Sequence, residues 1–315
     1  MILLTGSNGY LGNMVYPRIK KEFISVQGID LGIFSYSGWG YKRTDLSRDE
    51  YRLIFKPKQG YETVIHLAGI SNDPSSEINP AFTRRMNVEA SKRLIDFSSG
   101  SGVRRFVFAS SASVYGANDK LVTEDDALNP QSHYAESKAI IEEYLLGFKE
   151  LNPVVLRLGT LFGVSPKMRF DLAVNLMTRD AVQSKRVEVY GSGENFRPFL
   201  HVGDAATAVE FFSNSTISGI YNVSVGNTRI KSLAEMVSSI TDSKIEFVTQ
   251  DHSDSRNYRM DCTKLKSLNS YYPSVAISWG IEEIYKWCLD HKDALNNQDY
   301  YTLDCWKKYI ESENS

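Results

Sequence analysis

The sequence is poor in cysteine and proline, with three cysteines and nine prolines among 315 residues. Cys262, Cys288 and Cys305 are odd in number and lack metal-ligand spacing, so we expect neither a disulfide framework nor a metal site. No apolar run approaches the roughly 18 residues of a membrane span. The apolar residues 2–4 are too short for a signal-peptide core. These absences predict a cytoplasmic protein without membrane contact.

An excess of charge is absent as well, since 36 Lys and Arg face 38 Asp and Glu, for a net charge of -2. A nucleic-acid binder usually shows a basic excess, so no nucleic-acid partner is expected, although a local basic pocket for a phosphate remains possible. The apolar fraction of 42% and the charged fraction of 23% are typical of a globular chain. The length suits one large domain or two fused lobes.

Short apolar segments alternate with amphipathic ones through the first half, a rhythm typical of βαβ units and a parallel sheet. Pro17 is an awkward interior residue that we expect to shorten or kink the first helix. The predicted strands are 2–4, 25–29, 64–67, 106–109 and 154–156, and the predicted helices are 10–20, 80–98 and 133–150.

The rhythm changes after about residue 163, which predicts a smaller mixed α/β lobe interwoven with the first. We therefore predict a doubly wound Rossmann domain over 1–163 and a substrate lobe over 164–315. In the second half we predict helices at 170–184, 204–212 and 233–240, and strands at 187–190, 199–202, 220–223 and 245–248.

The segment TGSNGYLG, residues 5–12, follows the first strand and opens the first helix. Glycines in this pattern allow a tight turn and bring backbone N–H groups against a pyrophosphate at the helix N-terminus. Asp30, at the end of the second predicted strand, can accept both ribose hydroxyls of an adenosine and would repel a 2′-phosphate. This favours NAD over NADP. Lys42 and Arg43 could serve a phosphate, so NADP is disfavoured but not excluded.

Tyr134 and Lys138 stand four residues apart, which places them on one face of a predicted helix. A nearby ammonium lowers the pKa of a phenol, so this tyrosine is a candidate general base. The serines at 110, 111 and 113 follow a strand and either bond the same substrate oxygen or cap a turn.

Together these features resemble the extended short-chain dehydrogenase/reductase family, in its nucleotide-sugar epimerase and dehydratase branch. Order and spacing both agree with that family over most of the chain. The matching segments are TGSNGYLG at 5–12, Asp30, DL at 45–46, HLAG at 66–69, NV at 87–88, SSASVYG at 110–116, Tyr134 with Lys138, RLGTLFG at 157–163, RPFLHVGD at 197–204, YNV at 221–223 and Arg256 upstream of Asp261.

The resemblance implies a role for each matching residue. Tyr134 is similar to the catalytic base, Lys138 to its partner and Ser111 to the catalytic Ser/Thr. The implied contacts to NAD are Gly6, Asn8, Gly9, Tyr10, Leu11, Gly12, Asp30, Asp45, Leu46, Leu67, Ala68, Gly69, Asn87, Tyr134 and Lys138.

The implied substrate is a nucleotide-diphosphate sugar, whose diphosphate Arg197 and Arg256 would grip, since guanidinium groups suit phosphate. The segment KMRFD at 167–171 resembles a substrate-lobe segment of some members, so we expect Arg169 or Asn175 near the nucleotide or sugar. The further expected contacts are Asn72, Ser113, Thr160 and Tyr190, although the segment around Asn72 is equally compatible with a plain turn.

Two departures from the family pattern bear on the reaction. Family 4,6-dehydratases carry an Asp-Glu pair after the catalytic Thr, whereas Ala112 and Ser113 stand here, a pattern similar to 4-epimerases. Thr160 stands where many members have Asn, which puts the role of that Asn in doubt.

We therefore predict an NAD-dependent epimerase acting at sugar C4 through a transient 4-keto sugar. The alternative is an NAD(P)H-dependent reductase of a 4-keto nucleotide sugar, and dehydration, decarboxylation or a silent sensor or scaffold ranks lower. The apolar residues of the helices near 80–98 and 133–149 exceed what one core face needs, so we expect a homodimer through them. The resemblance also suggests that the protein acts in polysaccharide biosynthesis.

Overall fold

The computed structural model describes residues 1–22, 25–34, 38–48, 60–249 and 256–313. Its main feature is a seven-stranded parallel sheet in the order β11-β7-β5-β4-β1-β2-β3. The order reverses between β1 and β4, as in the predicted doubly wound fold, which is confirmed. The strands are β1 (Ile2–Thr5), β2 (Val26–Asp30), β3 (Lys42–Arg43), β4 (Thr63–His66), β5 (Arg105–Ser111), β7 (Pro153–Leu158) and β11 (Gly219–Val223).

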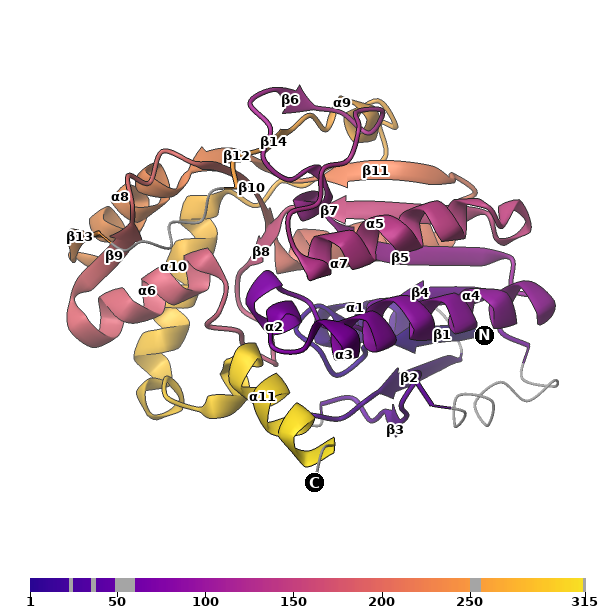
Figure 1. Ribbon diagram of the computed structural model, residues 1–315. Coiled ribbons are helices and arrows are strands. Elements are labelled where there is room, and N and C mark those ends of the chain that lie inside the picture. The colour runs from indigo at the N-terminus through magenta and orange to yellow at the C-terminus, as the bar shows by residue number, and fades with distance from the viewer. Residues whose placement is uncertain (23–24, 35–37, 49–59, 250–255, 314–315) are drawn as a thin grey trace.

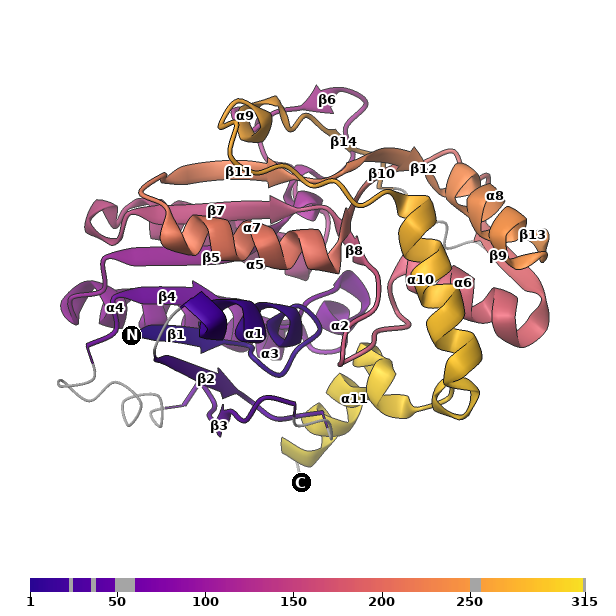
Figure 2. The ribbon, with the colours of Figure 1, turned by 180° about the vertical axis from the view of Figure 1, so that it is seen from behind.

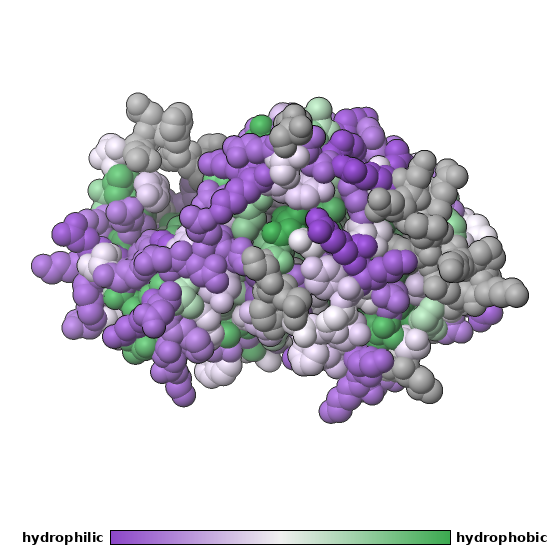
Figure 3. Space-filling model, turned by 90° about the horizontal axis from the view of Figure 1, so that it is seen from below, coloured by the Kyte–Doolittle hydropathy of each residue, from purple (hydrophilic) through white to green (hydrophobic). Residues whose placement is uncertain are grey.

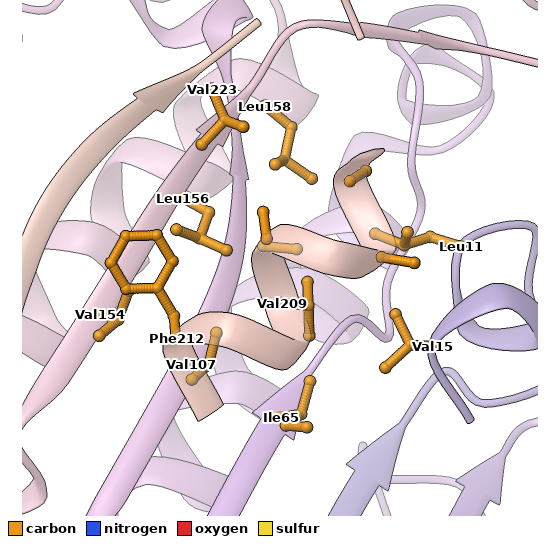
Figure 4. Packing of buried hydrophobic residues seen from close by; sticks show 14 of the residues in the cluster. Leu11, Val15, Ile65, Val107, Val154, Leu156, Leu158, Val209, Phe212 and Val223 are labelled. Carbon is orange, nitrogen blue, oxygen red and sulfur yellow. The ribbon is translucent and has the colours of Figure 1, made fainter. Parts of the chain in front are cut away.

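Helices cover both faces of this sheet, which explains why its strands are apolar runs. The helices α1 (Gly12–Glu22) and α7 (Val202–Asn214) lie on one face. The helices α3 (Pro80–Arg84), α4 (Ala90–Gly100) and α5 (His133–Leu146) lie on the other (Figures 1 and 2). Figure 4 shows Val209 and Phe212 of α7 packed over strand residues such as Val154. Each such fully buried side chain contributes about 1.5–3 kcal/mol.

Pro17 does not shorten helix α1, which continues to Glu22. A proline removes the hydrogen bond to the carbonyl four residues earlier, here that of Asn13. The indole Nε1 of Trp39 donates to this carbonyl at 3.2 Å, and its ring stacks on Tyr16. The freed acceptor therefore has a replacement partner, and the predicted shortening was wrong.

The single helix predicted over 80–98 is divided. Asn79 caps α3 by accepting from the backbone of Phe82 at 3.0 Å, and a π-helical turn, Arg85–Glu89, separates α3 from α4. In this turn Asn87 exchanges two hydrogen bonds with the backbone of Ile70. The periodicity of apolar residues along a helix does not report a hydrogen bond between residues 17 apart, so the division of the helix was not predicted.

The second lobe holds a three-stranded sheet, a parallel strand pair and three helices around a separate core. It does not take up all of 164–315, because α7 and β11 return to the main sheet, where β11 pairs with the free edge of β7. Its elements are β8 (Thr160–Phe162), α6 (Ala173–Ser184), β9 (Arg186–Tyr190), β10 (Phe196–His201), β12 (Gly226–Arg229), α8 (Ile230–Thr241), β13 (Lys244–Val248) and α10 (Ile277–Asp290).

Helix α11 (Thr302–Glu313), which sequence patterning did not predict, leaves the second lobe and packs on the first. Its Trp306 and Ile310 join Ile70 and Phe82 in a small core. At its end Glu313 pairs with Arg48 and Arg85 at 2.5 and 3.4 Å. The remaining short elements are α2 (Asp73–Glu77), the pair β6 (Leu121–Val122) and β14 (Arg259–Met260), and α9 (Thr263–Lys266).

No helix in the described ranges is long and apolar enough to cross a bilayer. The face seen from below is mostly hydrophilic, with hydrophobic areas scattered among polar ones (Figure 3). The three cysteines are buried free thiols.

Candidate active site

A cavity of about 660 Å³ lies beyond the carboxyl ends of the parallel strands, between the main sheet and the second lobe. This is where open α/β sheets bind their ligands, and the volume suits a small molecule. The predicted residues that line it are Gly6, Gly9, Tyr10, Leu11, Gly12, Asp30, Leu46, Leu67, Ala68, Gly69, Asn72, Ser111, Ser113, Tyr134, Lys138, Thr160, Arg169, Tyr190, Arg197 and Arg256.

The glycine loop is packed so tightly that side chains are excluded from two of its positions. Gly6 has a φ of +70°, and a Cβ there would lie 2.7 Å from the backbone nitrogen of Ala68. A Cβ on Gly12 would lie 2.0 Å from the carbonyl oxygen of Gly6. The N-terminus of α1 therefore lies directly beside the cavity, where its N–H groups and dipole can hold an anionic pyrophosphate.

Asp30 ends strand β2 and forms part of the cavity wall. Its carboxylate accepts from the backbone nitrogens of Asn8 at 3.0 Å and Gly32 at 2.8 Å. Burial raises the pKa of Asp30, and these N–H groups act in the opposite direction. Fixed by these two contacts, the carboxylate can accept hydrogen bonds from a diol such as an adenosine ribose. Lys42 and Arg43 lie on exposed strand β3 and do not line the cavity.

Tyr134, Lys138 and Ser111 come together at the end of strand β5. Ser132 caps α5 by accepting from Ala135 at 3.1 Å, which places Tyr134 in the first turn. The Ser111 hydroxyl accepts from the backbone and hydroxyl of Ser113 at 3.2 and 2.9 Å and is hydrogen-bonded to Tyr134. The phenol and this hydroxyl can therefore contact one substrate oxygen together.

The expected lowering of the Tyr134 pKa by Lys138 is not what the structure shows. Burial raises the pKa of Tyr134 to about 12, and the groups that lower it are Ser111 and Arg169. Lys138 donates to the Ala109 carbonyl at 2.8 Å, and burial lowers its own pKa to about 8.

A buried ion pair behind this group went unnoticed in the sequence. Glu142, one turn after Lys138, accepts from Arg157 at 3.0 and 2.7 Å and from the Ser110 hydroxyl. Arg157 also donates to the Tyr115 hydroxyl at 2.8 Å. The network ties α5 to β5 and β7, and only the spacing of four from Lys138 hinted at it.

Arg169 and Asp171 form a second, largely buried pair in the wall of the cavity. The guanidinium donates to both carboxylate oxygens, at 3.0 and 2.6 Å, and to the Ser71 hydroxyl at 3.1 Å. Asp171 also accepts from Asn72 at 2.5 Å and from Thr302 of helix α11 at 3.4 Å. Three segments that are distant in sequence meet at this carboxylate.

Arg197 and Arg256 lie beside each other, since Arg197 donates to the carbonyl oxygen of Arg256. The Arg256 guanidinium pairs with Asp73, so a carboxylate occupies part of the proposed diphosphate grip. Tyr190 is half exposed at the cavity edge, and its hydroxyl donates to Glu188 at 2.8 Å. Its ring is available for stacking.

Four predicted contacts do not line the cavity: Asn8, Asp45, Asn87 and Asn175. Asp45 caps its own turn through Ser47, and Asn87 holds the loop at Ile70. Asn175 is fully buried and binds the backbone of Gly163 and Arg169. The sequence alone does not separate these structural roles from ligand binding, because polar side chains at the ends of loops are used for both. Lining residues that went unpredicted include Phe34, Asp73, Lys167, Asp171, Thr302 and Trp306.

In the part of the chain that the structure describes, no three His, Cys, Asp or Glu side chains are grouped to hold a metal. The cavity instead joins the glycine loop to the buried Lys138 and the partly buried Tyr134 and Ser111. This fold and site define the class as an α/β enzyme that binds a dinucleotide beyond the carboxyl ends of its strands.

A family model described as the NAD dependent epimerase/dehydratase family matches residues 2–224. The chain belongs to this family. It is 26% identical to an uncharacterised UDP-glucose epimerase of Bacillus subtilis over 89% of this chain and 95% of that protein. It is 28% identical to a dTDP-glucose 4,6-dehydratase of Streptomyces griseus over 92% of this chain and 94% of that protein.

Among solved structures, MoeE5 in complex with UDP-glucose and NAD is similar with a TM-score of 0.82 and 26% identity, over 92% of this chain and 98% of that one. UDP-glucose 4-epimerase of Thermotoga maritima, with a TM-score of 0.82 and 24% identity over 92% and 98%, shares the fold. NAD is the cofactor of the family, and the glycine loop and the Asp30 carboxylate fit it.

Proposed function

We propose that the protein is an NAD-dependent epimerase that inverts C4 of a nucleotide-diphosphate sugar. The observation that carries the proposal is the reacting end of the cavity, where Ser111 and Tyr134 stand together and Ala112 and Ser113 follow. Elimination of water needs an acid at C6, and neither residue supplies one. The carboxylates nearby, Asp73 and Asp171, are each paired with an arginine.

In the proposed mechanism Tyr134 takes the proton of the sugar 4-hydroxyl while Ser111 holds that oxygen. NAD, when bound, supplies a reversible hydride acceptor and the positive charge of its nicotinamide ring. Lys138, one turn further along α5, keeps its ammonium at the Ala109 carbonyl beside the reacting end of the cavity. Arg197 and Arg256 hold the diphosphate while the 4-keto sugar rotates within the site. Such positioning and charge control supply much of the barrier reduction in enzymes of this kind.

A substrate labelled with deuterium at C4 tests the reaction class directly. An epimerase returns the label to C4 of the inverted sugar, whereas a 4,6-dehydratase transfers it to C6. A 4-keto reductase does not consume the labelled sugar and instead requires added NADH or NADPH with a 4-keto substrate. Label recovered at C6, or turnover only with added reduced cofactor, would overturn the proposal.

We further propose a homodimer through α5 and the α3–α4 segment. Ile140, Tyr144, Leu146 and Phe148 are apolar or aromatic, and in one subunit they are only partly buried. A shallow hollow lined by Pro80, Val88 and Ile140 lies between the two segments. A second copy of the same helices would cover this surface, as in a four-helix seam.

A further inference from the structure

Lys167 is a buried lysine in the wall of the cavity, on the segment that connects β8 to α6. Only 1% of the residue is exposed. Its ammonium donates to the carbonyl oxygens of Met168, at 3.4 Å, and Asp299, and lies 3.9 Å from the centroid of the Phe34 ring. These contacts hold the ammonium in one place.

No carboxylate of the described ranges forms an ion pair with this ammonium. Burial and, after it, the charge of Arg169 lower the pKa of Lys167 to about 8, and the carboxylates of Asp171 and Asp299 offset this only in part. A buried cation in this position is costly to the folded protein unless an anion joins it. The nearby arginines differ from Lys167 in that each forms an ion pair, Arg169 with Asp171 and Arg256 with Asp73.

The position of Lys167 is at the cofactor end of the cavity. Two contacts fasten its segment to the glycine loop: Ser165 donates to the Tyr10 carbonyl at 2.8 Å, and the Tyr10 hydroxyl donates to the Gly163 carbonyl at 2.6 Å. Burial raises the pKa of Asp30, and the charge of Lys167 is among the groups that partly offset this. A dinucleotide bound in this way has its pyrophosphate at the glycine loop and the N-terminus of α1 and its adenosine ribose at Asp30.

We propose that Lys167 is a cofactor-binding residue, contributed by the second lobe, whose ammonium pairs with the pyrophosphate of NAD. The two negative charges of the pyrophosphate are then met by the N-terminus of α1 on one side and by Lys167 on the other. The proposal rests on NAD as the cofactor and is independent of which reaction the enzyme catalyses.

The test compares Lys167→Met with Lys185→Met as the matched control. Lys185 also donates to a backbone carbonyl, that of Thr241 at 2.9 Å, but does not line the cavity. After removal of bound nucleotide, calorimetry measures the Kd for NAD and, separately, the Kd for UDP. We expect Lys167→Met to raise the Kd for NAD at least tenfold with the Kd for UDP unchanged, and the control to change neither.

Lys167→Gln is the second variant, because it keeps a donor for the Asp299 carbonyl and removes only the charge. It should also raise the Kd for NAD at least tenfold and reduce the NAD that copurifies per subunit. Wild-type NAD affinity in either folded variant would overturn the proposal. A loss of UDP affinity with NAD affinity intact would instead assign Lys167 to the substrate. Neither readout depends on turnover, so a failure here is distinct from failure of the epimerase proposal.

Discussion

Lys138 donates to the carbonyl oxygen of Ala109 and lies 5.7 Å from the centroid of the Tyr134 ring, although both residues stand on one face of helix α5. The ammonium is therefore held by strand β5 and the phenol by Ser111. With its pKa raised to about 12 by burial, Tyr134 is protonated at neutral pH. Its use as a base thus requires further positive charge within the cavity, which the nicotinamide ring provides when NAD is bound.

Replacing Tyr134 by phenylalanine should lower kcat by about 10²–10⁴-fold, the usual contribution of a positioned acid or base. NAD content should stay that of the wild type, because the ring remains. The matched control is Tyr144→Phe on the same helix, whose hydroxyl bonds Asp96 outside the cavity. Full activity in Tyr134→Phe would contradict the proposed role.

Replacing Lys138 by methionine should stabilise the NAD-free protein at pH 7 while abolishing activity. Burial lowers the pKa of Lys138 to about 8 from an unfolded value near 10.5. This shift lowers the free energy of unfolding by about 3 kcal/mol at pH 7. The lost hydrogen bond to Ala109 offsets about 1.5–3 kcal/mol of this. We therefore expect a net gain of up to about 1.5 kcal/mol in urea unfolding.

The pH dependence of that gain has a definite sign. Between pH 8 and 10.5 the unfolded chain binds more protons at Lys138 than the folded one, so this lysine makes wild-type stability rise with pH. The advantage of Lys138→Met should therefore shrink through this window. An advantage that grows with pH would contradict the assignment.

Asp73 competes with the substrate diphosphate for Arg256, with which it forms an ion pair. Arg256→Met should raise the Kd for UDP at least tenfold, since charge-assisted hydrogen bonds contribute about 1.5–3 kcal/mol. Asp73→Asn should lower it by about threefold to tenfold. Arg229→Met, at an exposed pair with Glu194, is the control and should change neither value. Weaker UDP binding in Asp73→Asn would show that the carboxylate supports the site.

The tight glycine loop predicts that Gly12→Ala is costly, because the new Cβ would lie 2.0 Å from the Gly6 carbonyl oxygen. Overpacking of this kind costs about 1–3 kcal/mol or more. Gly226→Ala, where a Cβ meets nothing within 4 Å, is the control. Urea midpoints and NAD content per subunit measure the effect, and equal values for the two variants would rule out the proposed close approach.

Light scattering at micromolar concentration checks the proposed dimer. One chain has a mass of 35.6 kDa, and the wild type should have twice this mass. Ile140→Glu, which places a charge on the partly buried face of α5, should give monomers. Glu143→Gln, on the exposed side of the same helix, should stay dimeric. A monomeric wild type would refute the proposal.

The sheet was predictable from sequence because its strands are buried on both faces and read as short apolar runs between helices. The cofactor end was predictable because its chemistry is local, as in the glycine loop with Asp30 at the end of the next strand. Helix α11 was not, since its contacts with Ile70 and Phe82 join segments more than two hundred residues apart. For the same reason Asp171, Asp73 and Lys167 were not predicted as lining residues, although their segments were singled out, because their place in the cavity depends on how the lobes pack.

The most direct test of the proposed function is incubation of the purified protein, without added cofactor, with UDP-, GDP-, CDP- and dTDP-sugars, followed by proton NMR. Self-contained NAD chemistry predicts that one sugar yields its C4 epimer with no net oxidation, and that Tyr134→Phe abolishes this product. A dehydrated sugar, or turnover only of a 4-keto sugar with added NADH or NADPH, would contradict it.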